Sequence, residues 1–196
     1  MATTRAEQRE ATRRALLDEG RRRFGAEGYH DVVLTEIAQA AGVTKGAAYH
    51  HFGSKLGLFR AVAAELQHEL GERVAALADR RDDPWERLLA GCRAFLAAGA
   101  DPTVRRVLLV DAPTVLGWDE WRAMDEDSSA RHLAEALEAA AAAGRLPDRP
   151  VEPLARLLSG AMNEAVLWLA RTEDPDAREQ AERVLEALLD GLRADP

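Results

Sequence analysis

The sequence predicts an all-α fold of nine helices. Ala, Leu, Arg and Glu dominate its 196 residues, whereas the β-branched residues that favour strands are sparse. Over long stretches, apolar residues recur at spacings of three and four, which places them on one face of a helix. Pro and Gly separate these stretches, and none of them shows the alternation of a strand or an internal repeat.

The first four helices are delimited by residues that favour helix ends. Gly28 is expected to end the first helix in a left-handed conformation. Gly42 and Gly53 end the second and the third, and the hydroxyl of Thr44 can accept a backbone N–H at the start of the third. The fourth is a long helix with apolar residues at spacings of three and four. The predicted ranges are 5–26, 34–41, 45–52 and 55–78.

Proline marks the starts of the later helices. In Asp83-Pro84-Trp85-Glu86, the aspartate caps the helix, the proline takes the first position and the glutamate completes a capping box. Asp101-Pro102 and Asp174-Pro175 repeat this signal, and Gly117 separates two helices between them. The predicted ranges are 84–98, 102–115, 118–143, 152–171 and 174–192.

Charge is distributed unevenly along the chain. The net charge is −8, but residues 1–60 carry ten Lys or Arg and seven Asp or Glu, a net of +3, and the remainder carries −11. A basic N-terminal part beside an acidic remainder fits a protein that contacts phosphates only through its N-terminal part. A chance fluctuation of surface charge would give the same numbers, so charge alone does not decide the function.

The cellular setting follows from what the sequence lacks. Cys92 is the only cysteine, which indicates no disulfide framework and suits a reducing compartment. No apolar run approaches the ~18 residues of a membrane span. The N-terminal residues 1–14 are polar and lack the apolar segment of a signal peptide. We therefore expect a cytoplasmic protein.

Residues 35–55 carry the pattern that the function is expected to depend on. Two short helices joined by the tight turn Ala41-Gly42-Val43 are typical of a helix-turn-helix, whose second helix enters the major groove of DNA. Gly46 and Ala47 are small and let that helix approach the bases. The only two lysines of the chain lie here. Lys45 can donate to guanine, and Lys55, beside the free N–H groups of the fourth helix, can hold a phosphate.

Tyr49 and the histidine pair His50-His51 each allow a DNA-binding interpretation and an alternative to it. Tyr49 can direct its hydroxyl to a phosphate or pack as a core aromatic, and Phe52 suits the core. His50 and His51 offer donors at groove width, and a metal site would need a third ligand that is absent at helical spacing. With ordinary pKa values near 6.5 the two histidines would strengthen DNA binding in mild acid.

These residues together resemble a known family. Phe24, Gly28-Tyr29, Ile37-Ala38, Ala41-Gly42-Val43, Thr44-Lys45-Gly46, Tyr49-His50-His51-Phe52, Ser54-Lys55 and Leu58-Phe59 are similar to the N-terminal signature of the TetR family of transcriptional regulators. The resemblance covers about residues 10–65, a third of the chain, and beyond it only the helix layout is similar. It implies an N-terminal DNA-binding domain, residues 1–54, and an effector-binding and dimerisation domain, residues 55–196.

The resemblance also implies a function and its residues. The family suggests a homodimeric repressor on palindromic, double-stranded operator DNA, released when a small molecule enters the C-terminal domain. An activator or a ligand-independent regulator is the alternative within the family. By position, Lys45, Gly46, Ala47 and His50 would contact bases, and Thr44, Tyr49, His51 and Lys55 would contact phosphates.

Two positions depart from the family pattern. Val33 stands where the family often has Ser or Thr as the N-cap of the second helix, and Thr35 would then take over a phosphate contact. Ala48 replaces a larger residue, which would loosen the packing beneath the third helix.

The last two predicted helices are too apolar to stand alone in water. Paired with those of a second copy they would form a four-helix bundle across a two-fold axis. An intrachain core is the alternative. The expected interface residues are Leu154, Leu158, Ala161, Ala165, Ala181, Val184, Leu185, Leu188 and Leu192.

Three of the four tryptophans and several apolar residues would line a ligand cavity among the fourth to eighth helices. The alternative is that these side chains simply form the core. A flat or apolar effector is expected, and a cation would suit the acidic domain. The candidate residues are Leu66, Leu70, Trp85, Phe95, Asp111, Trp118, Trp121, Met124, His132, Met162 and Asn163.

Rival function classes find little support. The sequence lacks a glycine-rich phosphate loop, a nucleophile with plausible partners and a paired metal motif, so we expect neither an enzyme nor a cofactor. The acidic run at residues 125–127 is expected to be a solvated face. A helical adaptor that binds only protein is the other alternative, and a test of DNA binding discriminates between them.

Overall fold

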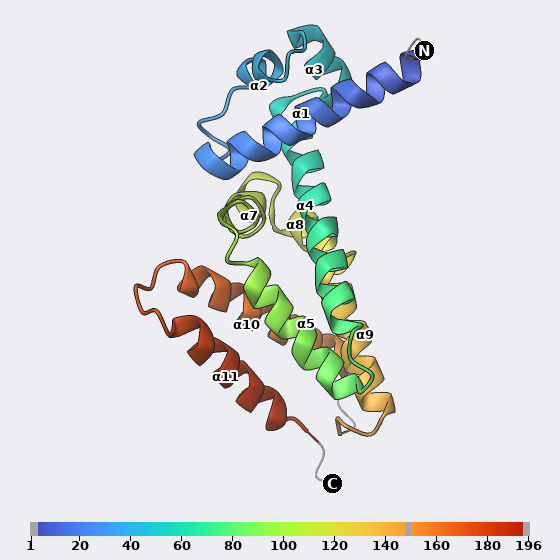
Figure 1. The fold of residues 1–196 in the computed structure, drawn as a ribbon, viewed down its shortest axis with the longest axis vertical. Coiled ribbons are helices and arrows are strands. Elements are labelled where there is room, and N and C mark those ends of the chain that lie inside the picture. The colour runs from blue at the N-terminus through green and yellow to red at the C-terminus, as the bar shows by residue number, and fades with distance from the viewer. Residues whose placement is uncertain (1–3, 148–149, 194–196) are drawn as a thin grey trace. The chain divides into compact units, whose positions relative to one another are not determined.

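The computed structural model describes residues 4–147 and 150–193. All regular elements in these two ranges are helices, which confirms the all-α prediction (Figure 1). The first five are α1 (Arg5–Glu27), α2 (Leu34–Ala40), α3 (Lys45–Phe52), α4 (Lys55–Ala78) and α5 (Pro84–Ala98). They are followed by α6 (Pro102–Val104), the π-helix η1 (Arg105–Asp111), α7 (Ala112–Val115), α8 (Trp118–Glu126), α9 (Ser129–Ala142), α10 (Val151–Leu169) and α11 (Ala177–Asp190).

Local capping sets the helix ends near the N-terminus. Gly28 adopts φ 86° and its N–H donates to the carbonyl of Phe24, which ends α1. Gly42 and Gly53 also have positive φ, 70° and 73°, a conformation that costs glycine little. At α5, the Asp83 carboxylate accepts from two backbone N–H groups of the first turn. The predicted bounds of α3, α4 and α5 are confirmed because these signals are local.

The number of helices differs from the prediction by one. Elements α6, η1 and α7 follow one another without a break, so the described residues form ten helices rather than nine. The additional helix arises because the predicted helix over residues 118–143 is divided between α8 and α9. Ser128 has non-helical backbone angles there, and its hydroxyl donates to the carbonyl of Gln67 at 2.7 Å. The break between α8 and α9 thus coincides with a hydrogen bond from Ser128 to a residue 61 positions away in the sequence.

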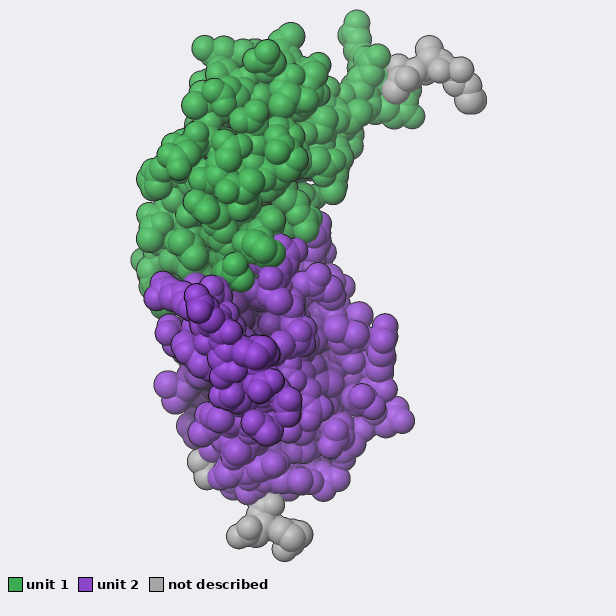
Figure 2. Space-filling view, turned by 60° about the vertical axis from the view of Figure 1, so that its left-hand side comes forward, with its two compact units in different colours: residues 1–66, 102–121 green, residues 67–101, 122–196 purple. Residues whose placement is uncertain are grey.

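The chain forms two compact units (Figure 2). Unit 1 comprises residues 1–66 and 102–121, and unit 2 comprises residues 67–101 and 122–196. Unit 1 therefore holds α1–α3, the first half of α4, and the segment from α6 to the start of α8. The sequence did not indicate that residues 102–121 pack with the N-terminal helices. The division into functional domains after residue 54 stays a prediction.

Aromatic rings form the centre of unit 1. Phe24 and Phe59 are fully buried and meet edge to face with their centroids 5.1 Å apart, a favourable geometry for aromatic pairs. Gly20 allows α1 to approach α4, because a Cβ there would lie 3.3 Å from the side chains of Leu58 and Val62. These contacts place the helix-turn-helix on a packed base.

Unit 2 contains a polar cluster beside its apolar core. Asp125 is buried, which corrects the prediction that residues 125–127 form a solvated face. Its two carboxylate oxygens accept from Gln67 at 2.9 Å, from Ser129 at 2.8 Å and from Arg122 at 2.8 Å. Burial of the carboxylate is tolerated because it is paired with a guanidinium and hydrogen-bonded. Glu126 and Asp127 remain exposed.

Candidate functional site

Helix α3 presents an exposed polar face to solvent. Lys45, Tyr49 and His50 are exposed, and the Lys45 ammonium lies 5.7 Å from the centre of the Tyr49 ring. Ala48 is fully buried and directs the opposite face of the helix into unit 1. Spacings of three and four residues keep the polar side chains on one side of the helix. This face can meet a flat or grooved partner without rearrangement of the core.

The first turn of α3 is capped and open. The Thr44 hydroxyl accepts from the N–H of Ala47 at 3.1 Å, which confirms Thr44 as the predicted N-cap. A Cβ built on Gly46 would meet only that hydroxyl, at 3.9 Å, among the described atoms outside neighbouring backbone. Packing within the chain therefore does not require glycine at position 46. The small residue leaves space for a partner to approach the backbone.

His51 is less available as a cation than the sequence suggested. Burial, followed by the positive charges of Arg9, His50 and Arg13, holds the pKa of His51 below its usual value of 6.5. The protonated form of His51 is therefore disfavoured in the free chain by burial and by these neighbours. A neutral imidazole still donates one hydrogen bond, so a phosphate contact from His51 would be a neutral one.

Helix α2 begins without a side-chain cap. Val33 occupies the N-cap position and makes no side-chain hydrogen bond to the helix. Its side chain is nearly half exposed. Thr35, in the first turn of α2, is half-buried. The free N–H groups of this turn therefore depend on solvent or on a bound partner.

Lys55 holds the loop between α1 and α2. Its ammonium donates to the carbonyls of Tyr29 at 2.8 Å and Val32 at 2.9 Å, with a longer contact to His30 at 3.4 Å. It also lies 4.3 Å from the centre of the Tyr29 ring. An ammonium has three N–H donors, and three carbonyls surround this one. Sequence reasoning placed Lys55 at a phosphate, whereas in the free chain it joins the start of α4 to the loop.

Residues of η1 contact the same loop. The Asp111 carboxylate accepts from the N–H of Tyr29 at 2.9 Å. The Arg106 guanidinium donates to the carbonyl of Glu27 at 3.0 Å, so a cation satisfies a carbonyl at the C-terminal end of α1. Asp111 was predicted to contact a ligand. The structure places it in unit 1, where it positions the backbone that leads into α2.

Two further residues of the predicted ligand set also lie in unit 1. Trp118 and Trp121 pack on each other with centroids 4.9 Å apart. The indole of Trp121 is buried and donates to the carbonyl of Leu108 at 2.7 Å, whereas Trp118 is 64% exposed. Trp121 therefore acts as a core residue of unit 1.

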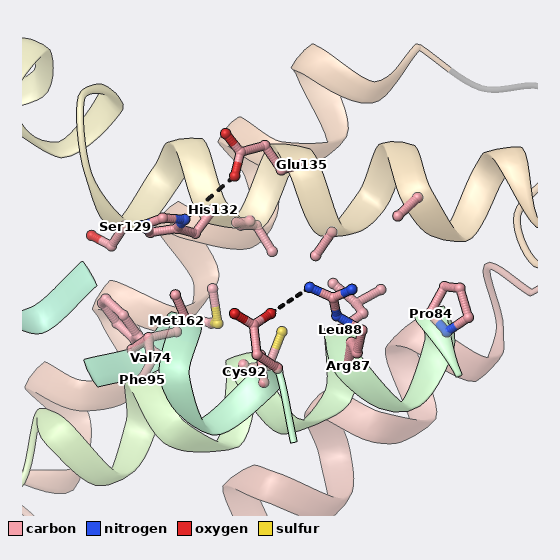
Figure 3. A pocket seen from close by; sticks show the side chains of 17 residues that line it. Val74, Pro84, Arg87, Leu88, Cys92, Phe95, Ser129, His132, Glu135 and Met162 are labelled. Atoms are coloured by element: carbon pink, nitrogen blue, oxygen red, sulfur yellow. Dashed lines mark hydrogen bonds and ion pairs between the residues drawn. The ribbon is translucent and has the colours of Figure 1, made fainter. Parts of the chain in front are cut away.

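Unit 2 contains a cavity of about 290 Å³ (Figure 3). Helices α4, α5, α9 and α10 supply its walls. Phe95, His132 and Met162 of the predicted set line it. Sequence reasoning missed its small residues, because alanine and glycine carry no signal for a cavity. The wall residues missed by the prediction include Val74, Ala75, Ala78, Leu88, Gly91, Cys92, Ser129, Leu133, Ala136 and Ala139.

The other predicted ligand residues are outside the described lining of this cavity. Leu70 and Trp85 are buried in unit 2, and the guanidinium of Arg193 lies 5.4 Å from the Trp85 ring centre. Leu66 is buried at the end of the unit 1 part of α4. Met124 and Asn163 are half-buried.

Helices α10 and α11 expose an apolar surface. The exposed fractions are 73% for Leu157, 44% for Trp168, 60% for Val184 and 57% for Leu188. Solvated leucine, valine and tryptophan in one area indicate an interaction surface. A shallow groove there contains six of the nine predicted interface residues: Ala161, Ala165, Ala181, Val184, Leu185 and Leu188. Of the remaining three, Leu158 is buried within the chain, and Leu154 and Leu192 are half-buried.

The described part of the chain contains neither a cluster of metal-binding side chains nor a helix that could cross a membrane. Across residues 4–147 and 150–193, no three His, Cys, Asp or Glu side chains are grouped closely enough to hold a metal ion. None of the helices described is at once long and apolar enough to cross a membrane.

Family models match both parts of the chain. Residues 16–62 match the family described as bacterial regulatory proteins, tetR family. Residues 85–192, more than half of the chain, match the family described as tetracyclin repressor-like, C-terminal domain. The first match contains the helix-turn-helix, and the second contains α5 to α11.

Individual proteins show the same similarity. The chain is 44% identical over 70 residues to the HTH-type transcriptional regulator SrpR of Pseudomonas putida. This alignment covers 36% of this chain and 33% of SrpR. The chain is 41% identical over 88 residues to the HTH-type transcriptional repressor Rv1474c of Mycobacterium tuberculosis. This alignment covers 45% of this chain and 42% of that protein. The matches thus span a third to less than half of these relatives. A TetR-family transcriptional regulator from Pectobacterium atrosepticum has a crystal structure that is similar over 99% of this chain and all of that one, with 35% identity and a TM-score of 0.80.

Proposed function

The chain belongs to the TetR family of DNA-binding transcriptional regulators, which are not enzymes, and we propose that it is a homodimeric repressor that an effector releases from a palindromic operator. The observation that carries this proposal is the exposed, capped face of α3. Lys45 and His50 are solvated there, and the backbone at Gly46 is open. A helix of this kind fits the major groove, where lysine can donate to guanine.

Each residue predicted to contact DNA is assigned a contact that its exposure and hydrogen bonds permit. Lys45, Gly46, Ala47 and His50 face the bases in this proposal. Thr44 and Tyr49 lie beside them on the exposed face and contact phosphates through hydroxyls, as phosphate contacts set the register of a protein on DNA. Thr35 and His51 are half-buried and contribute neutral contacts. Lys55 supports the site by holding the loop before α2.

The apolar surface of α10 and α11 supports the homodimer. A helix-turn-helix dimer contacts two half-sites about 34 Å apart, one turn of DNA. We propose a second copy of the chain as the partner of this surface, because in a closed two-fold dimer both chains bury the same patch. Trp168 and Leu188 would lie in the centre of the resulting four-helix bundle.

The cavity in unit 2 supports release by a small molecule. Helix α4 contributes Val74 and Ala78 to the cavity wall and Lys55 to the loop before α2. A ligand that binds one state of α4 more tightly by about 1–3 kcal/mol would change DNA affinity ~5- to 150-fold. The relative Rv1474c is named a repressor, which favours repression over activation here. A cytoplasmic location suits both DNA and small-molecule partners.

DNA binding is tested by titrating the full chain onto the DNA on either side of its own gene. We expect a specific complex whose affinity falls steeply with salt, since phosphate contacts release counterions. Lys45→Ala should reduce the preference for that site over unrelated DNA. A helical adaptor that binds only protein would give no complex at low salt with any flanking fragment.

A further inference from the structure

We propose that the cavity of unit 2 binds a small, uncharged molecule with an apolar or aromatic body and one hydrogen-bonding group that pairs with His132. This inference rests on the proposed effector-released regulator, because it names the chemical class of its effector. It is carried by the apolar lining of the cavity, by the pairing of the charged side chains among the described lining residues, and by His132, which has a ring nitrogen left for a ligand.

The interior of the cavity is apolar and small. Its volume of about 290 Å³ lies near the lower limit of ligand pockets, which are commonly ~300–1,000 Å³. Such a volume suits a molecule of one or two rings rather than a long chain. The buried side chains that form the interior are Val74, Leu88, Cys92, Phe95, Leu133 and Met162.

The charged side chains among the described lining residues, Asp79, Arg87 and Glu135, are each paired with an opposite charge. Arg87 pairs with Asp79, and Figure 3 shows a dashed line from a guanidinium to a carboxylate beside the Arg87 label. Glu135 pairs with Arg131 at 2.9 Å and with the Nδ1 atom of His132 at 3.4 Å. An ionised ligand would lose its water without gaining a counter-charge, which is costly in an apolar cavity. The acidic surplus of the C-terminal part therefore does not make this cavity a cation site.

Two other polar side chains of the wall, Cys92 and Ser129, carry no charge with which to hold an ionic ligand. Burial raises the pKa of the Cys92 thiol to about 12, so it stays protonated and behaves as a small apolar group. The Ser129 hydroxyl already donates to Asp125 at 2.8 Å and accepts from Gln67 at 2.7 Å. Neither side chain selects a charged ligand.

His132 retains one nitrogen for a ligand. Its Nε2 atom lies 3.9 Å from the nearest carboxylate oxygen of Glu72, which exceeds hydrogen-bond distance. Its Nδ1 atom faces Glu135, and this contact orients the ring. With its Nδ1–H directed at Glu135, the neutral imidazole accepts at Nε2, so a hydroxyl of the ligand can donate to it.

Four probes of one ring size test the ligand class on the full chain without DNA. Toluene, benzyl alcohol, benzoate and benzylammonium share the ring and differ in their polar group. Calorimetric titration at pH 7 should show benzyl alcohol binding at least tenfold more tightly than either ion. If either ion binds as tightly as the alcohol, or the alcohol does not bind, the proposal is overturned.

Three variants locate the binding. Ala136→Leu fills the cavity with a good helix former and should abolish binding of benzyl alcohol and toluene, whereas Ala134→Leu on the same helix should leave both unchanged. His132→Leu should remove the preference for benzyl alcohol over toluene and leave toluene bound. Circular dichroism melting shows that each variant is folded. Wild-type binding in a folded Ala136→Leu chain would place the site elsewhere and overturn the inference.

Operator binding is measured on the same samples before any probe is added. DNA binding without binding of a neutral probe overturns this inference and leaves the regulator intact. Binding of benzyl alcohol without DNA binding supports the ligand class and overturns the proposed function instead.

Discussion

The ammonium of Lys55 donates a 2.8 Å hydrogen bond to the carbonyl of Tyr29 and lies 4.3 Å from the centre of its ring. On the other side of the same peptide segment, the N–H of Tyr29 donates to Asp111. The loop that precedes α2 is thus held by residues 26 and 82 positions away in the sequence. Both side chains therefore hold the backbone that leads into α2.

Lys55→Met should destabilise the chain by about 1.5–3 kcal/mol, because hydrogen bonds from a charged donor are lost. Lys45→Met is the matched control, since Lys45 is exposed and should change stability little. Denaturant unfolding measures both. DNA affinity of the Lys55 variant should fall without a change in its salt dependence. A log–log salt slope smaller by about one would show instead that Lys55 contacts a phosphate.

Asp111→Ala should weaken operator binding and lower the unfolding free energy by about 1–3 kcal/mol, because the N–H of Tyr29 loses its acceptor. Asp111→Asn keeps a carbonyl oxygen as the acceptor and should retain most of the operator affinity and most of the unfolding free energy. Val110→Ala serves as the control on the same element, since Val110 is about half exposed. Fluorescence anisotropy with labelled operator gives the affinities. Equal affinity for Asp111→Ala and wild type would rule out a positioning role.

His51 makes stability depend on pH in mild acid. Its folded pKa lies below its usual 6.5 because the side chain is partly buried and near Arg9. The unfolded chain therefore takes up a proton more readily, and stability that is fully present above pH 6.5 is lost as the pH falls through the lowered pKa. His51→Gln should flatten this part of the profile between pH 5.5 and 7.5. If the unfolding free energy of the variant and of the wild type had the same pH dependence, the assignment to His51 would be wrong.

Leu188→Glu should convert a dimer to a monomer, because a carboxylate would be buried in the four-helix bundle. Leu77→Glu is the control, since Leu77 is a partly exposed leucine on α4 outside this surface. Sedimentation velocity gives the mass of each. If Leu188→Glu remains dimeric at micromolar concentration, the second copy binds through another surface.

Local signals explain how much of the fold was predictable. The hydroxyl of Thr44, the positive φ of Gly53 and the carboxylate of Asp83 each act within a few residues. They were sufficient to predict the bounds of α3, α4 and α5. Ser128 was missed because its partner, the carbonyl of Gln67, lies 61 residues away and helix periodicity does not report it.

Long-range contacts explain what the sequence did not reveal about the site. The type and spacing of residues on α3 suggested a DNA-binding face, and the structure exposes Lys45 and His50. Asp111 and Trp118 were assigned to a ligand cavity because acidic and aromatic residues suit one, yet both belong to unit 1. Only long-range packing decides which unit residues 102–121 join, because the spacing of their apolar residues does not report it.

Operator recognition by α3 is tested by a hydroxyl-radical footprint of the full chain on the DNA that flanks its own gene. We expect two protected half-sites related by a two-fold axis and spaced by about one helical turn. Lys45→Ala should lose that protection at concentrations where Lys45→Arg retains it. A uniform pattern along every flanking fragment, identical for Lys45→Ala and wild type, would contradict the claim that α3 recognises an operator.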